Sequence, residues 1–219
     1  ADAVLALAAP ATVDFSEVVY ESTTFPNSFK SNANLAGIVF PQNVTATASA
    51  AFQKTGMTSV TVLKDISYGS NAFDSCASLV SVTVEEGVTE IGNYMFQNTK
   101  LTDVTLPNSV TKIGASAFNG CSLTTINFGQ GVKTIENSAF QNCGELTEII
   151  LPDATETLGQ NAFGDCPKLA KISLGKNMKT LEAYCFVGYS KGCPLLGDII
   201  CRATTPPTLK DDYGTGPFG

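Results

Sequence analysis

The 219-residue sequence contains no histidine and no tryptophan. Histidine is the commonest general base and metal ligand, and the only side chain that ordinarily titrates near neutral pH. Its absence therefore argues against an enzyme. Tryptophan is a common part of the aromatic platforms that bind sugars, so its absence weakens the case for a glycan-binding protein.

Charged residues are also few, at 15% of the chain, and the 13 basic residues are outnumbered by 20 acidic ones to give a formal net charge of -7. The basic residues are scattered singly, so a phosphate backbone or an anionic membrane surface would be repelled. We therefore expect no nucleic-acid partner. No run approaches the roughly 20 apolar residues that cross a bilayer, so we expect no membrane span in this chain.

A repeat of 22 or 23 residues fills most of the sequence, and one copy begins at Leu101. The first apolar residue of the unit recurs at spacings of 22, 22, 22, 22, 23, 23 and 27 residues. These residues are Leu35, Met57, Leu79, Leu101, Leu123, Leu146, Leu169 and Leu196. Self-similarity at a fixed period of this size predicts a solenoid, in which each coil packs against the next.

Each repeat is expected to begin with a short strand. Apolar residues at offsets three and five alternate with polar residues, as Val104 and Leu106 do after Leu101, and this alternation is typical of a strand with one buried face. Proline or glycine follows in most copies and ends the strand. Successive strands of a solenoid pair in parallel, so we expect eight parallel strands.

The second half of each repeat carries Ala-Phe or a variant of it, with cysteine three residues after the phenylalanine in four copies. Alanine and cysteine four residues apart fit one or two helical turns, with the phenylalanine filling the interior of the coil. The aromatic positions are Phe52, Phe73, Phe96, Phe118, Phe140, Phe163 and Phe186, and the cysteine positions are Cys76, Cys121, Cys143 and Cys166. We expect these residues to form structural ladders.

The spacing of the seven cysteines indicates buried free thiols at the ladder positions. No C-x-x-C pair is present, so we expect no metal site, and nothing indicates a cofactor. Cys185 and Cys193 bracket about four residues more than the repeat needs, around 188–192, which we expect to bulge from the convex side. A disulfide between these two cysteines is left open.

Three regions follow from the repeat boundaries. Residues 1–34 do not match the unit and are expected to cap the first coil, because a stack of repeats otherwise exposes an apolar end. The repeats occupy 35–202, as seven units of 22–27 residues and a final strand. Residues 203–219, which begin near Pro206-Pro207, are expected to form a C-terminal cap or a linker.

Residues 101–121, LTDVTLPNSVTKIGASAFNGC, and 146–166, LTEIILPDATETLGQNAFGDC, resemble the BspA-like class of leucine-rich repeats. Units of that class run L-x-x-I-x-L-P-x-x-V-x-x-I-G-x-x-A-F-x-x-C, and the resemblance covers residues 35–202. It implies a bacterial protein that is extracellular, secreted or on the cell surface, with adhesion or host-protein binding as its usual role and no catalytic residues. Any signal or anchor segment is expected to lie outside this chain.

The pattern and the resemblance together predict an α/β fold: a right-handed leucine-rich-repeat solenoid. Short parallel strands are expected on its concave side, and short helical turns and loops on its convex side.

The exposed positions of the strands are the candidate site for a protein partner, because they would form a continuous surface. The candidate residues are Asp103, Thr105, Thr125, Asn127, Glu148, Ile150, Lys171 and Ser173. The alternative is that threonine and serine are there only because they suit exposed strands. A surface glycan is the alternative ligand, although the tyrosines do not fall in one row.

Overall fold

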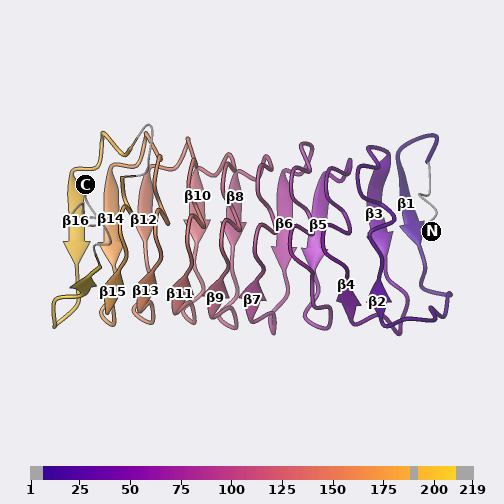
Figure 1. Cartoon of the computed structure of the whole chain (residues 1–219), viewed down its shortest axis with the longest axis horizontal. Coiled ribbons are helices and arrows are strands. Elements are labelled where there is room, and N and C mark those ends of the chain that lie inside the picture. The colour runs from indigo at the N-terminus through magenta and orange to yellow at the C-terminus, as the bar shows by residue number, and fades with distance from the viewer. Residues whose placement is uncertain (1–6, 188–191, 211–219) are drawn as a thin grey trace.

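The computed structural model describes residues 7–187 and 192–210, and over these residues the chain is a parallel β-solenoid of about eight coils (Figure 1). One row of strands runs along one side of the coils. It consists of β1 (Ala11–Asp14), β3 (Leu35–Val39), β5 (Ser59–Val62), β6 (Ser81–Val84), β8 (Asp103–Thr105), β10 (Thr125–Asn127), β12 (Glu148–Ile150), β14 (Lys171–Leu174) and β16 (Asp198–Cys201). The exposed side of this row is called the strand face below.

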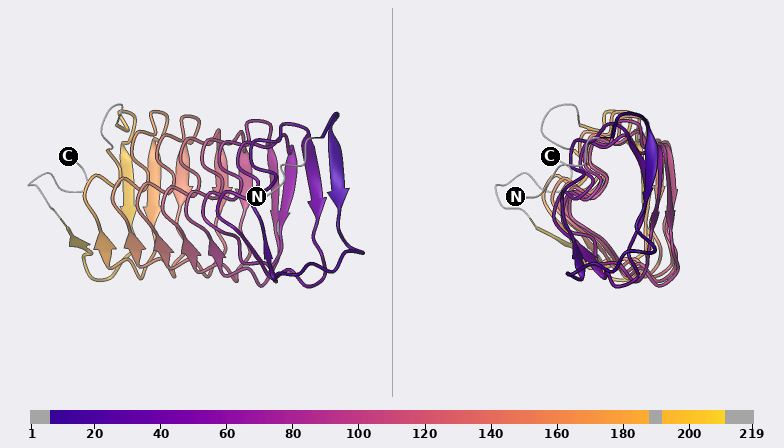
Figure 2. Two further views of the ribbon diagram at one scale, coloured as in Figure 1. Left: turned by 45° about the vertical axis from the view of Figure 1, so that its right-hand side comes forward. Right: turned by 90° about the vertical axis from the view of Figure 1, so that its right-hand side faces the viewer.

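A second row of two-residue strands follows the first bend of the coils. Its members are β2 (Thr24–Phe25), β4 (Ala46–Thr47), β7 (Glu90–Ile91), β9 (Lys112–Ile113), β11 (Thr134–Ile135), β13 (Thr157–Leu158), β15 (Thr180–Leu181) and β17 (Thr208–Leu209). From β7 to β17 they form one six-stranded parallel sheet. Viewed along the solenoid axis, the turn segments that complete each coil lie opposite the longer strands (Figure 2).

The described residues contain no helix, so the α/β class and the helical turns predicted from the sequence are wrong. The segments expected to be helical have two residues with left-handed backbone, four positions apart, such as Ser116 (φ 54°) and Gly120 (φ 72°). A right-handed helix cannot pass through such positions. These segments are therefore a succession of turns.

Hydrogen bonds between coils explain why the turn conformation is stable. The backbone N–H groups of Ser116, Phe118 and Gly120 donate to carbonyls of the next coil at 2.8–2.9 Å. In an α-helix the same N–H groups would bond to carbonyls four residues back in their own segment. The stack thus gains three bonds between coils at this segment instead of a helical ladder within each coil.

The seven phenylalanines of the repeat form a single column inside the coils. Neighbouring rings from Phe52 to Phe186 are stacked, with centroids 5.2–6.5 Å apart, and each ring is at most 1% exposed. Phe25 extends the column into the N-terminal segment, at 5.9 Å from Phe52. Stacked rings in this dry interior add specific geometry to a large buried area.

A second internal column, the thiol column, consists of Thr55, Cys76, Thr99, Cys121, Cys143, Cys166 and Cys193. Each of its cysteine thiols donates to the carbonyl of the phenylalanine one coil earlier, as Cys121 does to Phe96 at 3.1 Å. The hydroxyls of Thr55 and Thr99 donate to a phenylalanine carbonyl of their own coil at 2.9 Å. Either side chain is small enough for the column and satisfies its own polar hydrogen by bonding.

The two ends of the stack differ. At the N-terminal end β1 pairs with β3, and Phe25 and Phe29 are at most 2% exposed, so this segment packs on the coil that begins at Leu35. At the C-terminal end β17 continues the short-strand sheet beyond residue 202, although Pro206-Pro207 precedes it. Residues 1–6, 188–191 and 211–219, which include most of the expected bulge and parts of both expected caps, lie outside the described residues.

Candidate functional site

The candidate residues lie side by side on four neighbouring strands, β8, β10, β12 and β14. Six of them are exposed: Asp103, Thr105, Thr125, Asn127, Glu148 and Ile150. Lys171 is half-buried, and Ser173 is only 9% exposed and offers little surface. Ile150 is 59% exposed, which is a large exposed fraction for an isoleucine in a strand.

The strand face is not one continuous sheet. Strand β8 pairs with β10, and β12 pairs with β14, but no strand pairing joins β10 to β12 within residues 7–187. At the intact junctions, the N–H groups of Leu106 and Leu151 each donate to a carbonyl of the next coil at 2.9 Å. Phe128 has the same place in its coil, but its N–H makes no such bond to β12.

A pocket of about 470 Å³ opens over this break between β10 and β12. Exposed residues from both strands line it, among them the candidates Thr125, Asn127, Glu148 and Ile150. The buried side chains of Phe128 and Leu151 also contribute to its lining. The break therefore turns part of a flat sheet into a concave feature with both polar and apolar walls.

Arg202 closes one side of the pocket, and sequence reasoning missed it. Its guanidinium donates to the carbonyls of Leu151 at 2.9 Å and Leu174 at 3.1 Å, and it forms an ion pair with Asp153 at 3.2 Å. One side chain thus links three coils. The available signal was that Arg202 is the only arginine in the sequence and directly follows the last long strand.

The charges around the pocket are paired. Glu148 binds Lys171 at 2.8 Å, and this contact raises the pKa of the Lys171 ammonium. Asp153 binds Lys176 at 2.9 Å as well as Arg202, and these two cations hold the pKa of its carboxyl below the ordinary value. The paired charges leave hydroxyl and amide groups as the main polar groups available to a ligand.

Thr125, Asn127 and Thr147 supply these hydroxyl and amide groups. Their side chains are exposed and make no hydrogen bond with the described part of the chain. Together with Ile150 they form an uncharged surface that can exchange hydrogen bonds and bury apolar area.

The cysteines offer no comparable chemistry along most of their column. Burial raises the pKa of the Cys121 thiol to about 11 and that of Cys143 well above its usual range, which keeps both protonated and unreactive at neutral pH. All seven cysteines are free, so the disulfide left open between Cys185 and Cys193 is not formed. Cys193 lies instead in the thiol column beside Cys166. It follows Phe186 by seven residues, whereas the other cysteines of the column follow their phenylalanine by three, so the repeat pattern does not identify it.

No group of three or more cysteine, aspartate or glutamate side chains in the described ranges is arranged to hold a metal ion. Those ranges also contain no helix long and apolar enough to cross a membrane.

A family model for the BspA-type leucine-rich repeat region matches the chain in six copies, over residues 12–77 and 67–192. The chain belongs to this family. The match includes residues 12–34, ahead of the point at which the repeat is first recognisable in the sequence, and this agrees with the pairing of β1 and β3. No curated protein sequence matches the chain significantly.

Two solved structures share the fold of this BspA-type protein. A leucine-rich cell-surface protein of Faecalibacterium prausnitzii A2-165 is 22% identical with a TM-score of 0.60, and the match covers 88% of this chain and 60% of that one. A leucine-rich repeat protein of Eubacterium ventriosum ATCC 27560 is 23% identical with a TM-score of 0.61, covering 88% and 62% respectively. The chain thus spans about three fifths of the length of these relatives.

Proposed function

We propose that this BspA-type protein is a non-catalytic scaffold that binds a partner protein through its strand face, outside the cell or on the cell surface. The observation that carries the proposal is the pocket over the break between β10 and β12. It combines unpaired hydroxyl and amide groups with the exposed Ile150, and its charges are already neutralised. Such a mixture of apolar area and adaptable hydrogen bonding is typical of protein interfaces.

Adhesion or binding to a host protein is the role we propose for this scaffold. The family supports an interaction function, and the relative from F. prausnitzii is described as a cell-surface protein. The net charge of -7 favours a partner with neutral or basic contact residues over an acidic one.

A surface glycan remains the alternative ligand, because threonine and asparagine side chains also hydrogen-bond sugars. The structure offers this alternative less support. Among the large exposed apolar side chains of the described residues, the only aromatic one is Tyr94, which lies in a turn segment and not on the strand face. A sugar on the strand face would therefore lack an aromatic ring to stack on.

The test is a binding screen of the purified chain against a panel of extracellular-matrix and epithelial surface proteins, with a glycan array run in parallel. For any protein that binds, we expect Ile150→Asp to weaken affinity at least tenfold, since it places a charge at the centre of the contact. The substitution should leave stability unchanged because the side chain is exposed.

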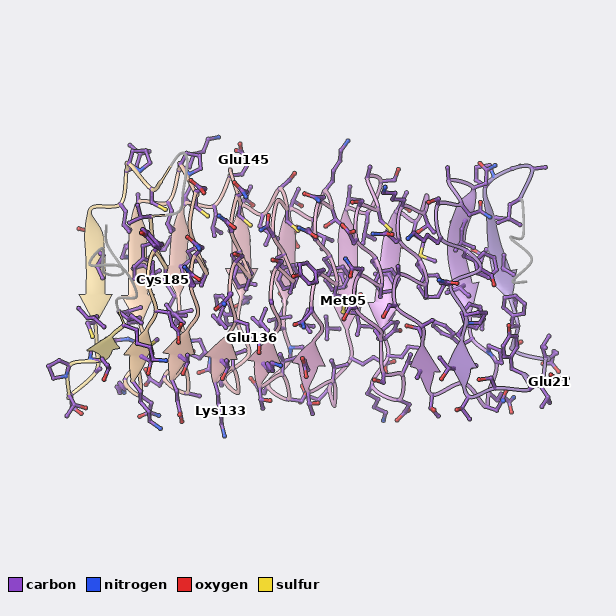
Figure 3. All side chains as sticks on the ribbon, in the orientation of Figure 1. Glu21, Met95, Lys133, Glu136, Glu145 and Cys185 are labelled. Atoms are coloured by element: carbon purple, nitrogen blue, oxygen red, sulfur yellow. The ribbon has the colours of Figure 1, made fainter. Side chains whose placement is uncertain are left out.

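Lys133→Ala is the matched control, because Lys133 is exposed beside β11, where its side chain points away from the coils along the short-strand row (Figure 3). Binding that is lost equally in both variants, or in neither, would overturn the proposal for the strand face. Binding to glycans alone would establish the alternative.

A further inference from the structure

Cys193 differs from the other cysteines of the thiol column in its access to solvent. Cys76, Cys121, Cys143 and Cys166 are at most 2% exposed, whereas Cys193 is half-buried. It lines a surface pocket of about 510 Å³ together with neighbours that include Val187 and Pro194. A small molecule can therefore reach this thiol but not the thiols deeper in the column.

Cys166 lies directly behind Cys193, one coil further into the stack. The thiol of Cys193 donates to the carbonyl of Phe163 at 3.2 Å, and that of Cys166 donates to the carbonyl of Phe140 at 3.3 Å. The same step separates the two thiols as separates the two phenylalanines, whose rings are 5.2 Å apart. A disulfide accepts a Cα separation of about 4.4–6.8 Å, which includes one coil step of about 4.8 Å.

The backbone around Cys193 is held in place. Gly192 has left-handed backbone (φ 61°), and its N–H donates to the carboxylate of Asp165 at 2.9 Å. Asp165 belongs to the same turn segment as Cys166, so this bond ties the residue before one cysteine to the residue before the other. The two thiols are thereby kept together without a covalent bond.

We propose that Cys193 and Cys166 form a thiol–disulfide exchange site, in which Cys193 attacks a small disulfide such as oxidised glutathione and Cys166 resolves the mixed disulfide. In the first step the Cys193 thiolate attacks one sulfur of the small disulfide, whose S–S bond breaks and releases one thiolate. In the second, the deprotonated Cys166 attacks the Cys193 sulfur and releases the other thiolate. The two protons lost by the cysteines pass to the two thiols released, so two protein thiols are oxidised and one disulfide is reduced.

The electrostatics fit these two roles. When Cys193 is deprotonated, the S–H of Cys166 can turn from the Phe140 carbonyl and donate to the Cys193 thiolate, and this interaction lowers the pKa of Cys193 and favours it as the attacking group. The same contact raises the pKa of Cys166, and burial raises it further, so Cys166 stays protonated and Cys193 is the thiol that attacks first. No other cysteine of the described residues combines partial exposure with a neighbouring thiol in the thiol column.

The product would fasten the last coils of the solenoid to each other. The bond between residues 166 and 193 would close a loop that includes the extra residues after Phe186. Closing such a loop restricts the unfolded chain and raises the melting temperature of the end of the stack.

The test is to reduce the protein, remove the reductant, add oxidised glutathione and map disulfides by mass spectrometry, in a Cys201→Ser background that removes the other accessible thiol. We expect a single internal disulfide between Cys166 and Cys193, with the loss of two hydrogens in mass. Cys166→Thr should stop at a glutathione adduct on Cys193, and Cys193→Ser should not react. The thiol column already accepts threonine at Thr55 and Thr99, so Cys166→Thr is expected to fold.

Cys143→Thr is the matched control and should oxidise as the parent does, because Cys143 has no accessible neighbour. A disulfide from Cys193 to Cys185, a glutathione adduct on Cys193 that persists in the parent, or no reaction of Cys193 would each overturn the proposal. Circular dichroism of every variant verifies that the solenoid is intact, so a folding defect is not mistaken for lost reactivity.

Discussion

At the scale of single residues, the internal columns show how far a repeat motif can be interpreted physically. The apolar positions follow from the period alone, and the structure buries every repeat phenylalanine. The two threonines in the thiol column differ from the motif, but they too donate to a phenylalanine carbonyl, that of their own coil where the cysteines use that of the previous coil. Each position in the column requires a small side chain that can donate a hydrogen bond. The sequence pattern alone does not reveal this requirement.

The first prediction concerns the phenylalanine column. Phe140→Ala should destabilise the protein by about 3–5 kcal/mol, because it removes a fully buried ring and leaves a cavity between two stacked neighbours. Phe140→Leu should cost clearly less, since it refills most of the volume. Urea unfolding measures both, and equal losses for the two variants would contradict a tightly packed column.

Tyr68 is a residue whose role could not be predicted from the repeat. Its ring packs on Phe73 and Phe40, and its hydroxyl accepts a hydrogen bond from the N–H of Leu63 at 3.3 Å and donates to the carbonyl of Thr61 at 3.4 Å. Its coil reaches Phe73 in 16 residues from Met57, whereas the next coil needs 17 from Leu79 to Phe96. Tyr68 thus packs and hydrogen-bonds within the one coil segment that is a residue shorter than the segment that follows it.

A pH dependence follows from this burial, which raises the pKa of Tyr68 to about 12. An unfolded chain ionises its tyrosines near pH 10, so between about pH 10 and 12 the unfolded state loses this proton more readily and the free energy of unfolding falls. The contribution is fully present below pH 10. At pH 11 the parent should have lost about 1 kcal/mol more than Tyr68→Phe does, relative to pH 9. Denaturant unfolding at both values measures the difference, and identical losses would rule out the raised pKa.

At the scale of elements, the prediction of helical structure from the sequence was wrong for the turn segments. Alanine and cysteine four residues apart fit a helix, and most of the left-handed positions are not glycine but residues such as Lys54, Tyr94 and Tyr184. The usual signal for left-handed backbone is therefore missing. The deciding factor is the hydrogen bonding to the next coil, which no single segment carries in its own sequence.

Gly120 provides the test at this scale. Its equivalents in the neighbouring coils are Asn98 (φ 54°) and Asn142 (φ 60°). Gly120→Asn should therefore be tolerated to within about 1 kcal/mol, whereas Gly120→Val should cost about 1–3 kcal/mol, because a β-branched residue is strained in left-handed backbone. Thermal and denaturant unfolding of the two variants checks this, and an Asn variant as unstable as the Val variant would contradict the assignment.

At the scale of the whole molecule, the parallel stacking could be predicted from the period. The period gave eight strands where the long row has nine, because β1 lies in a segment that does not match the unit, and it did not reveal the breaks in the strand face. Such breaks separate β3 from β5, β6 from β8, and β10 from β12. Breaks in strand pairing depend on the relative tilt and the spacing of neighbouring coils. Contacts between repeats determine both, and the pattern within one repeat does not. The pocket and Arg202 were missed for the same reason, because Arg202 meets Leu151 across 51 residues of sequence.

Amide hydrogen exchange can reveal the break between β10 and β12. The N–H groups of Leu106 and Leu151 donate across intact junctions at 2.9 Å and should exchange slowly. The N–H of Phe128, at the same place in its coil, should exchange at least tenfold faster. Residue-resolved NMR measures all three rates, and equal protection of Phe128 and Leu106 would show that the sheet is continuous.

The N–H groups of Ser138, Phe140 and Asn142 donate to carbonyls of the next coil at 2.8–3.0 Å, and these bonds join the coils of β10 and β12 on the side opposite the strand face. A partner side chain inserted between β10 and β12 would therefore break no hydrogen bonds between strands. The bonds between the turn segments would keep the two coils in register. We therefore expect the distortion of the backbone on binding to be confined to the junction between β10 and β12, with the other coils unchanged.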